Sequence, residues 1–401
     1  MAKAPRGERL ILTLTGRRNA GKSSLINALV GQEIAIVSDT PGTTTDPVPK
    51  SYELLPLGPV TFYDTAGIDD VGELGEKRIA KTRKILFRTD IAMLVVGKDG
   101  LHEEDRKLIR EIQDLKIPFI LVFNKLDLVE LKQEDLDFGG MMNVRTCEIS
   151  AKEGKGISEL KDMLVSLAPS FLKQEKVLAG DLIYSGDVVV LVAPIDLAAP
   201  KGRLILPQVQ ILREILDNDA VGMIVKEREI EAVFDKLGQK PDLVITDSQV
   251  VLKVAGDVPE DVQMTTFSIL FARYKGDLEM LVEGARKIDE LENGDKVLIA
   301  ETCSHNVQCD DIGRVKIPRW LTQYTGKQLD YEFVGGNDFP EDLEKYKLIF
   351  HCGGCMINPT TMMRRITEAR RRGVAITNYG VAISKLQGVL DRALEPFDLD
   401  L

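Results

Sequence analysis

The first part of the chain alternates between short, continuous apolar runs and longer segments in which apolar residues recur every three or four positions. The apolar runs lie at residues 9–16, 60–67, 91–98 and 118–125. They are rich in β-branched residues and predict strands that are buried on both faces of a parallel sheet. The segments with helical spacing lie at residues 22–31, 103–115 and 156–169. This alternation predicts a doubly wound α/β layer.

Two further α/β segments follow. Residues 183–266 continue the alternation without a recognisable chemical motif, and we interpret them as a structural or subunit-contact domain. The last segment has a helical pattern at 276–291 and a strand pattern at 295–302, and it closes with a helix, a strand and a helix over 359–386. We therefore predict a first domain with a mostly parallel sheet, followed by two smaller α/β domains. The predicted domain bounds are 1–172, 173–266 and 267–401.

Composition narrows the class of protein. The chain has 401 residues, enough for two to four domains, and a formal net charge of −11, whereas domains that grip nucleic acid are generally basic. A short basic start runs directly into the first predicted strand, which does not fit a signal peptide. No apolar stretch approaches the roughly 20 residues that a membrane helix needs. We expect a soluble, cytoplasmic protein that binds neither nucleic acid nor a membrane.

Residues 16–24 fit the phosphate-binding pattern G-x-x-x-x-G-K-[ST], between a predicted strand and a predicted helix. In such a loop the glycines allow the backbone to wrap a phosphate, and the N–H groups at the helix start supply positive charge. Lys22 is expected to reach the β- and γ-phosphates and the Ser23 hydroxyl to bind Mg²⁺. The residues predicted to bind nucleotide here are Gly16, Asn19, Ala20, Gly21, Lys22, Ser23 and Ser24.

Three more motifs complete a GTP site. In the DTAG motif at 64–67, Asp64 would reach the Mg²⁺ shell and Gly67 would lie beside the γ-phosphate. In the NKLD motif at 124–127, Asp127 can accept from the two N–H donors of a guanine edge, which adenine lacks. The residues predicted to brace the base come from the NKLD motif and from the SAK motif at 150–152: Asn124, Lys125, Ser150, Ala151 and Lys152. These motifs together predict GTP binding.

This set of motifs resembles the group of GTPases that contains TrmE, Era and EngA. The resemblance implies that residues 38–47 are the first switch, with Thr44 completing the Mg²⁺ shell. Members usually have arginine where this chain has Thr45, and Ile68 stands where Ras-like proteins place a glutamine. Asn19 matches an asparagine that in TrmE-like members helps to hold K⁺ in place of an arginine finger. The resemblance therefore implies slow GTP hydrolysis that K⁺ stimulates.

Cysteine and histidine cluster near the C-terminus. The chain has five cysteines and three histidines. Two short segments combine both residue types: C-x-H at 303–305 and H-C-x-x-C at 351–355. Each set follows a predicted strand, so the two loops can converge at the carboxyl ends of adjacent strands. Three thiolates and a histidine suit zinc, and three thiolates with an exchangeable fourth ligand suit a [4Fe–4S] cluster. The spacing leaves both open, together with buried cysteines that bind no metal.

The whole chain resembles the HydF family of [FeFe]-hydrogenase maturation GTPases. The resemblance implies a middle domain that forms a homodimer and a C-terminal domain with a [4Fe–4S] cluster. It implies a scaffold that receives a di-iron precursor made with radical-SAM hydrogenase maturases and delivers it to apo-[FeFe]-hydrogenase. The implied thiolate ligands are Cys303, Cys352 and Cys355, and the candidates for the fourth ligand are His351, His305 and Glu301. Cys309 lies outside this pattern, and Cys147 is predicted to be a core residue.

A second hypothesis is an RNA- or ribosome-assembly GTPase with a C-terminal zinc domain. The acidic composition and the lack of a GXXG-containing nucleotide-binding module count against it. The basic run at 364–372 is interpreted as a solvated helix face, with an anionic cargo or an acidic partner as the alternative.

Overall fold

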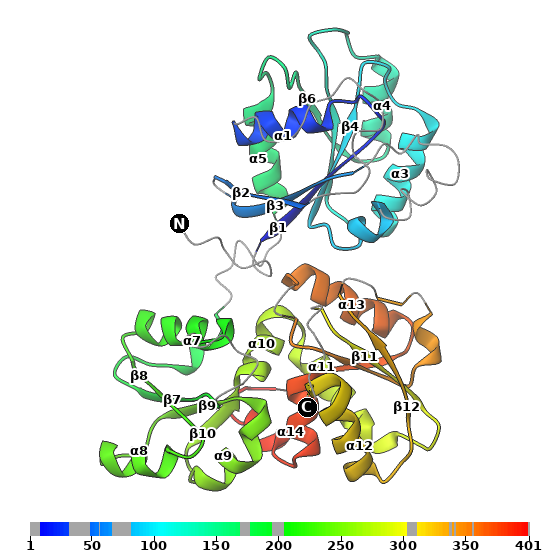
Figure 1. Ribbon diagram of the computed structural model, residues 1–401. Coiled ribbons are helices and arrows are strands. Elements are labelled where there is room, and N and C mark those ends of the chain that lie inside the picture. Colours follow the sequence, from blue (N-terminus) through cyan, green and yellow to red (C-terminus); the bar gives the residue numbers. More distant parts are fainter. Residues whose placement is uncertain are drawn as a thin grey trace. The chain divides into compact units, whose positions relative to one another are not determined.

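The chain forms two compact units, residues 1–175 and 176–401, which are described separately (Figure 1). The structure, a computed structural model, describes residues 9–31, 49–55, 57–65, 82–168, 177–194, 204–302, 311–336, 339–340, 342–354 and 357–399. Over these residues no helix has the length and apolar character needed to cross a bilayer.

The first unit is built on a six-stranded sheet with the order β2-β3-β1-β4-β5-β6. Its strands are β1 (Leu10–Thr15), β2 (Pro49–Leu54), β3 (Gly58–Asp64), β4 (Ile91–Val96), β5 (Phe119–Phe123) and β6 (Arg145–Glu148). The helices with described bounds are α1 (Lys22–Val30), α3 (Glu103–Asp114), α4 (Gln133–Met141) and α5 (Ile157–Leu167). Only β2 runs antiparallel to its neighbour among these strands.

Burial explains why the apolar runs become strands. Every residue of β4 and β5 is buried, because α1 and α5 cover one face of the sheet and α3 covers the other. The predicted α/β fold with a doubly wound, mostly parallel sheet is therefore confirmed. Cys147, on β6, is buried in the core between the sheet and α5, as predicted.

The second unit contains two four-stranded sheets, with orders β10-β9-β7-β8 and β12-β11-β13-β14. The strands are β7 (Val188–Val192), β8 (Val221–Val225), β9 (Leu243–Thr246), β10 (Gln263–Thr266), β11 (Lys296–Ala300), β12 (Asp330–Val334), β13 (Leu348–His351) and β14 (Ala375–Asn378). The helices are α7 (Leu206–Asp217), α8 (Ile230–Leu237), α9 (Val251–Asp257), α10 (Phe267–Lys275), α11 (Leu278–Arg286), α12 (Ile317–Thr325), α13 (Pro359–Arg371), α14 (Tyr379–Leu386) and α15 (Leu390–Leu394). All described pairings in these two sheets are parallel.

One hydrophobic core joins the two sheets of this unit. Helices α10, α11 and α14 lie between the sheets (Figure 1), and the core includes Val189 of β7, Leu270 of α10 and Ile349 of β13. The chain then returns to the first of these sheets, because α15 packs against β10 and Arg392 donates to the carbonyl oxygen of Val258 at 2.8 Å. The domain division at residue 266 stays a prediction.

The second of these sheets ends in a single row. Ala300 of β11 pairs with Val334 of β12 and with His351 of β13, and His351 pairs in turn with Asn378 of β14. Each of these residues is the last of its strand. The segments that leave the row therefore start side by side, and two of them lead into the cysteine motifs.

Two helical glycines of the second unit give a test of this packing. A Cβ atom added to Gly284 on α11 would lie 1.9 Å from the carbonyl oxygen of Ile376 on β14, so Gly284→Ala forces the helix and the sheet apart. We expect it to destabilise the unit by roughly 1–3 kcal/mol. Gly256→Ala on α9 meets nothing within 4 Å and should stabilise by about 0.5–1 kcal/mol, because alanine favours a helix. Thermal unfolding followed by circular dichroism measures both, and equal midpoints would contradict the close approach of α11 to β14.

Candidate functional site

The loop between β1 and α1 has the backbone of a phosphate-binding loop. Gly16 has a φ of +136° and Gly21 a φ of +94°. A Cβ atom on Gly16 would lie 2.2 Å from the carbonyl oxygen of Val95, and one on Gly21 would lie 2.2 Å from Nδ2 of Asn124. Both positions therefore require glycine, and the loop packs directly on the ends of neighbouring strands.

The predicted phosphate and Mg²⁺ groups gather around this loop. Nζ of the buried Lys22 donates to the carbonyl oxygens of Gly16 at 2.9 Å and Arg17 at 2.8 Å, so its ammonium group lies across the loop. The Ser23 hydroxyl donates to Oδ2 of Asp64 at 2.6 Å, although 41 residues separate the two in the sequence. A hydroxyl and a carboxylate thus meet where Mg²⁺ is predicted. Ser24 lies in the first turn of α1, and Thr44 and Gly67 lie outside the described residues.

Asn124 links the three segments of the predicted base site. Its Nδ2 donates to the carbonyl oxygen of Ala20 at 2.9 Å, and its Oδ1 accepts from the N–H of Ala151 at 3.0 Å. The Ser150 hydroxyl donates to Oδ1 of Asp127 at 2.8 Å, which orients that carboxylate. Lys125, in the left-handed region with a φ of +71°, follows Asn124, and Lys152 is exposed. The structure therefore joins the NKLD motif, the SAK motif and the phosphate loop by direct hydrogen bonds.

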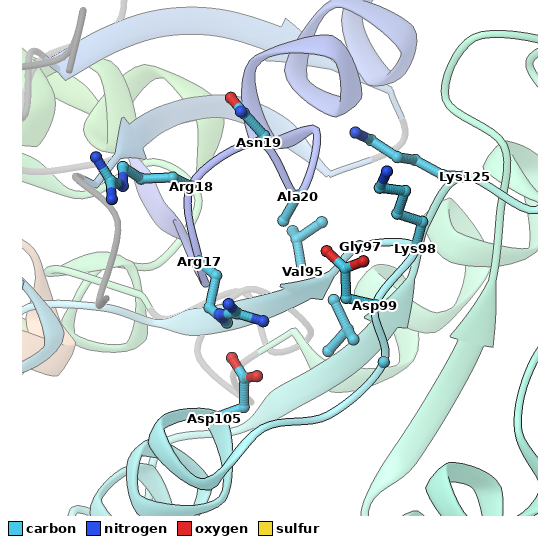
Figure 2. Close-up of a pocket in the computed structure, with 12 residues that line it drawn as sticks. Arg17, Arg18, Asn19, Ala20, Val95, Gly97, Lys98, Asp99, Asp105 and Lys125 are labelled. Carbon is cyan, nitrogen blue, oxygen red and sulfur yellow. The ribbon is translucent and has the colours of Figure 1, made fainter. Parts of the chain in front are cut away.

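A hollow of about 310 Å³ lies beside the phosphate loop (Figure 2). It is lined by Arg17, Arg18, Asn19, Ala20, Val95, Val96, Gly97, Lys98, Asp99, Gly100, Asp105 and Lys125. Arg17 points toward Asp105, the third residue of α3, whose pKa is raised by burial and lowered to a smaller extent by the charge of Arg17. Oδ2 of Asp105 also accepts from the N–H of His102 at 2.9 Å, so it caps α3. Asp105 belongs to none of the sequence motifs. Its position beside Arg17 depends on how α3 packs against the phosphate loop, which the local sequence does not reveal.

Asn19 adopts a left-handed backbone conformation with a φ of +56°. Asparagine tolerates this region better than most residues other than glycine, so the conformation is by itself one reason for an asparagine here. In Figure 2 the Asn19 side chain lies at the outer side of the loop. The residue is exposed, which leaves its side-chain carbonyl accessible to a cation.

The second candidate site lies at the row of strand ends in the second unit. The N–H of Cys352, just after β13, donates to the carbonyl oxygen of Ala300 at 2.8 Å. Its Sγ accepts from the N–H of Thr302 at 3.2 Å and lies 3.2 Å from the Thr302 hydroxyl. N–H donors aimed at sulfur stabilise a thiolate and are typical of iron–sulfur ligands. The two cysteine loops thus begin in contact with each other, as convergence on one metal centre requires.

The remaining predicted cysteines continue directly from these contacts. Cys303 follows Thr302 along the chain, and Cys355 follows Gly354, but both lie outside the described residues, as do His305 and Cys309. Within the described ranges no group of three His, Cys, Asp or Glu side chains could hold a metal ion. The described donors nevertheless fit a thiolate-held metal centre, because Cys352 already receives the N–H of the residue that precedes Cys303.

His351 has both ring nitrogens engaged inside the protein. Its Nδ1 lies 2.6 Å from the carbonyl oxygen of Cys352, and its Nε2 lies 2.9 Å from Nη1 of Arg365. Because arginine can only donate, Nε2 accepts and Nδ1 carries the hydrogen. Burial, and then the charge of Arg365, lower the pKa of His351 to about 3, so the ring is neutral. His351 would have to give up one of these partners to bind a metal.

Glu301, the other described candidate for a fourth ligand, is 4% exposed. Its Oε2 lies 3.5 Å from Nε of Arg314, which follows the cysteine loop. Its backbone N–H donates to the carbonyl oxygen of Val334 at 2.9 Å, which fixes the start of the loop. The carboxylate is therefore close to the cysteine loop but already faces a cation. The identity of the fourth ligand stays a prediction.

Two buried, positively charged side chains near Cys352 belong to none of the sequence motifs. Nζ of Lys275, at the end of α10, donates to the carbonyl oxygens of Gly354 at 3.0 Å and Ile357 at 3.1 Å. Lys275 is 2% exposed, and Arg365, which contacts His351, is 1% exposed. The only sequence signal for Arg365 is its place in the basic run, and Lys275 has none.

The rest of the basic run is largely committed to ion pairs on the surface of α13. Arg371 and Arg372 each bind Glu368, at 2.7 Å and 2.6 Å, and Arg372 also binds Glu344 at 2.9 Å. These pairs neutralise much of the charge that the sequence concentrates here. They fit the interpretation of this run as a solvated helix face, apart from the buried Arg365.

Comparisons with protein families divide the chain into three parts. Residues 11–125 match the model described as 50S ribosome-binding GTPase. Residues 178–276 match the hydrogen maturase F dimerization domain, and residues 279–396 match the hydrogen maturase F tetramerization domain. Both of the latter domains therefore come from one family.

Among curated proteins the chain is similar to tRNA modification GTPases called MnmE. It is 30% identical to the one from Acetivibrio thermocellus over 233 residues, which is 57% of this chain and 50% of that protein. It is 40% identical to the one from Moorella thermoacetica over 162 residues, which is 38% of this chain and 34% of that protein. The chain thus spans half the length of these relatives or less. A solved structure of an Era variant from Aquifex aeolicus, bound to GDP and AlF₄⁻, is similar with a TM-score of 0.37 and 21% identity, over 55% of this chain and 94% of that one.

The contacts of Asn124 predict the effect of its removal. Asn124→Ala breaks the hydrogen bonds to Ala20 and Ala151 and leaves the buried carbonyl oxygen of Ala20 and the partly buried N–H of Ala151 without this partner. Because each such group costs about 1–3 kcal/mol, we expect guanine nucleotide to bind about tenfold more weakly or worse. Titration with a fluorescent GDP analogue measures this. Gln133→Ala, an exposed amide on α4 that bonds only Asp137 in the described residues, is the matched control and should bind as the wild type does.

Proposed function

Because the chain belongs to the hydrogen maturase F family, with an N-terminal GTPase domain of the TrmE/Era type, we propose that it is a GTP-hydrolysing scaffold for the maturation of [FeFe]-hydrogenase. In this proposal the first unit binds and hydrolyses GTP with Mg²⁺ and K⁺. The second unit holds a [4Fe–4S] cluster on Cys303, Cys352 and Cys355. The cluster domain receives a di-iron precursor and delivers it to apo-[FeFe]-hydrogenase.

The first unit supports GTP as the nucleotide. The Ser150 hydroxyl donates to Asp127, the carboxylate that would accept from a guanine edge, and Asn124 ties this loop to the phosphate loop. Ser23 and Asp64 supply the two oxygen groups from which Mg²⁺ would be bound, and Lys22 supplies the charge for the phosphates. These groups position a nucleotide and neutralise its charge, which is most of what phosphoryl transfer asks of a protein.

The single observation that carries the metal part of the proposal is the contact between Cys352 and Thr302. It joins the two cysteine loops through an N–H···S hydrogen bond of 3.2 Å. A cluster held by three thiolates keeps one iron whose ligand can exchange, and this suits a protein that must both accept a cargo and release it. The buried Glu301 and His351 adjoin Thr302 and Cys352 in the sequence and are the described candidates for the exchangeable position.

The two hydrogen maturase F domains also bear on assembly. Their descriptions as dimerization and tetramerization domains support self-association through the second unit. We propose a homodimer as the basic assembly. Radical-SAM hydrogenase maturases and apo-[FeFe]-hydrogenase are the proposed partners in cargo transfer.

Metal analysis of the anaerobically purified protein tests the metal centre. We expect iron and sulfide in equal amounts, the broad visible absorption of an iron–sulfur cluster, and little zinc. In Cys352→Ser the iron content should fall severalfold while GTP hydrolysis continues, because the cysteine loops and the nucleotide site lie in different units. Cys147→Ala, in the core of the first unit, is the control and should keep its iron. A colourless protein with stoichiometric zinc would refute the scaffold proposal and favour an assembly GTPase with a zinc domain.

The role of Asn19 is tested by comparing GTP hydrolysis in KCl and in NaCl. The wild type should hydrolyse GTP faster in KCl. Asn19→Gly keeps the left-handed backbone conformation and removes the side-chain carbonyl, so nucleotide should still bind while the advantage of KCl disappears. If Asn19→Gly still responds to K⁺ as the wild type does, the asparagine serves only the shape of the loop.

A further inference from the structure

We propose that Lys275 is a positioning residue of the metal centre: it holds the backbone at Gly354 and Ile357, on either side of Cys355 in the sequence, and offsets the negative charge of the cluster. This inference rests on the proposed function, because it assumes that the cysteines bind an iron–sulfur cluster. Lys275 belongs to α10, the first helix after the sheet of the dimerization domain, and lies far from the cysteine motifs in the sequence.

The contacts of Lys275 are with residues on both sides of Cys355 in the sequence. Its ammonium group donates to the carbonyl oxygen of Gly354, the residue before Cys355, and to that of Ile357, two residues after it. The N–H of Ile357 also donates to the carbonyl oxygen of Gly354 at 3.2 Å, which closes the same turn. One side chain thus fixes the backbone on both sides of a proposed thiolate ligand.

The conformation of Gly354 adds to the precision of this turn. Gly354 has a φ of +65°, and a Cβ atom there would lie 2.5 Å from Cε of Met362 on α13. Gly354 therefore contacts the ammonium group of Lys275 and leaves no room for a side chain on the side of Met362. A backbone held on both sides of a ligand position is what a preformed metal site requires.

The two hydrogen bonds alone do not explain why a positively charged residue stands at position 275. Burying an ammonium group is costly, and a neutral side chain could donate hydrogen bonds to the same two carbonyl oxygens. A [4Fe–4S] cluster held by thiolates is an anion in both of its common oxidation states. An adjacent cation offsets that charge, and the effect is strong where water is excluded.

A second buried cation, Arg365, lies close to Cys352. Arg365 on α13 is also buried and donates to His351, the residue before Cys352. The start of α13, capped by Asn358, follows the loop directly, and a helix N-terminus carries partial positive charge. Lys275 and Arg365 come from different helices, so the positive surroundings are not a by-product of one basic segment.

Two measurable consequences follow from the removal of Lys275. The reduced cluster carries one more negative charge than the oxidised cluster, so an adjacent cation favours the reduced state. A neutral residue at position 275 should therefore shift the midpoint potential of the cluster to a more negative value. The freed loop should also release iron roughly tenfold faster to a chelator, as is usual when a residue that supports a metal ligand is lost.

The test uses the full chain, reconstituted anaerobically with ferrous iron and sulfide. Lys275→Met and Lys275→Gln remove the charge, and Lys275→Gln keeps a hydrogen-bond donor. Lys275→Arg keeps the charge. Lys287→Met, an exposed lysine that pairs with Glu290 on the surface, is the control. Iron loss to a chelator and a redox titration followed by electron paramagnetic resonance are measured on each variant, and circular dichroism of each variant without iron verifies folding.

We expect a more negative midpoint potential in both neutral variants and faster iron loss in Lys275→Met, while Lys275→Arg keeps the potential of the wild type and the control keeps both values. If Lys275→Met does not fold, Lys275→Gln decides the question. Neutral variants with the iron retention and potential of the wild type would overturn this role of Lys275. A wild-type protein that takes up no cluster would instead refute the proposed function.

Discussion

Parallel pairing of the strands is the constraint on which both candidate sites depend. Parallel neighbours point their carboxyl ends to the same edge of a sheet, so the segments that follow them start side by side. In the first unit this edge brings together the phosphate loop after β1, Asp64 at the end of β3 and Asn124 after β5. In the second unit the same rule aligns Ala300 and His351, and the segments that follow them carry the cysteine motifs. One architectural rule therefore prepares a nucleotide site in one unit and a candidate metal centre in the other.

The two sites use hydrogen bonds for different purposes. At the nucleotide site the side-chain amide of Asn124 binds backbone groups from two other loops. These hydrogen bonds connect three motifs to one another. At the candidate metal centre the buried cations Lys275 and Arg365 bind residues next to the proposed ligands. Rigid support of this kind suits a centre whose protein ligands must keep their places while an exchangeable ligand comes and goes.

Much of the fold could be predicted from the sequence, because its elements follow local patterns. The apolar runs of β4 and β5 and the helical spacing of α3 and α5 depend only on which residues are apolar and how they are spaced. Prediction was weaker where packing between distant segments decides the outcome. The return of α15 to β10 and the core shared by two sheets have no signal in the sequence around them.

The sequence by itself determined which motifs the two candidate sites contain, because each motif is a short segment recognised by residue type and spacing. It placed the glycines of the phosphate loop, the guanine-binding motif and the cysteine pattern. Only the tertiary structure decided how the residues around these motifs are engaged. Lys275 meets Gly354 across 79 residues and Arg365 meets His351 across 14, and such contacts depend on how helices pack against strand ends. Side chains that act through packing carry no pattern of their own, which is why the structure was needed to find them.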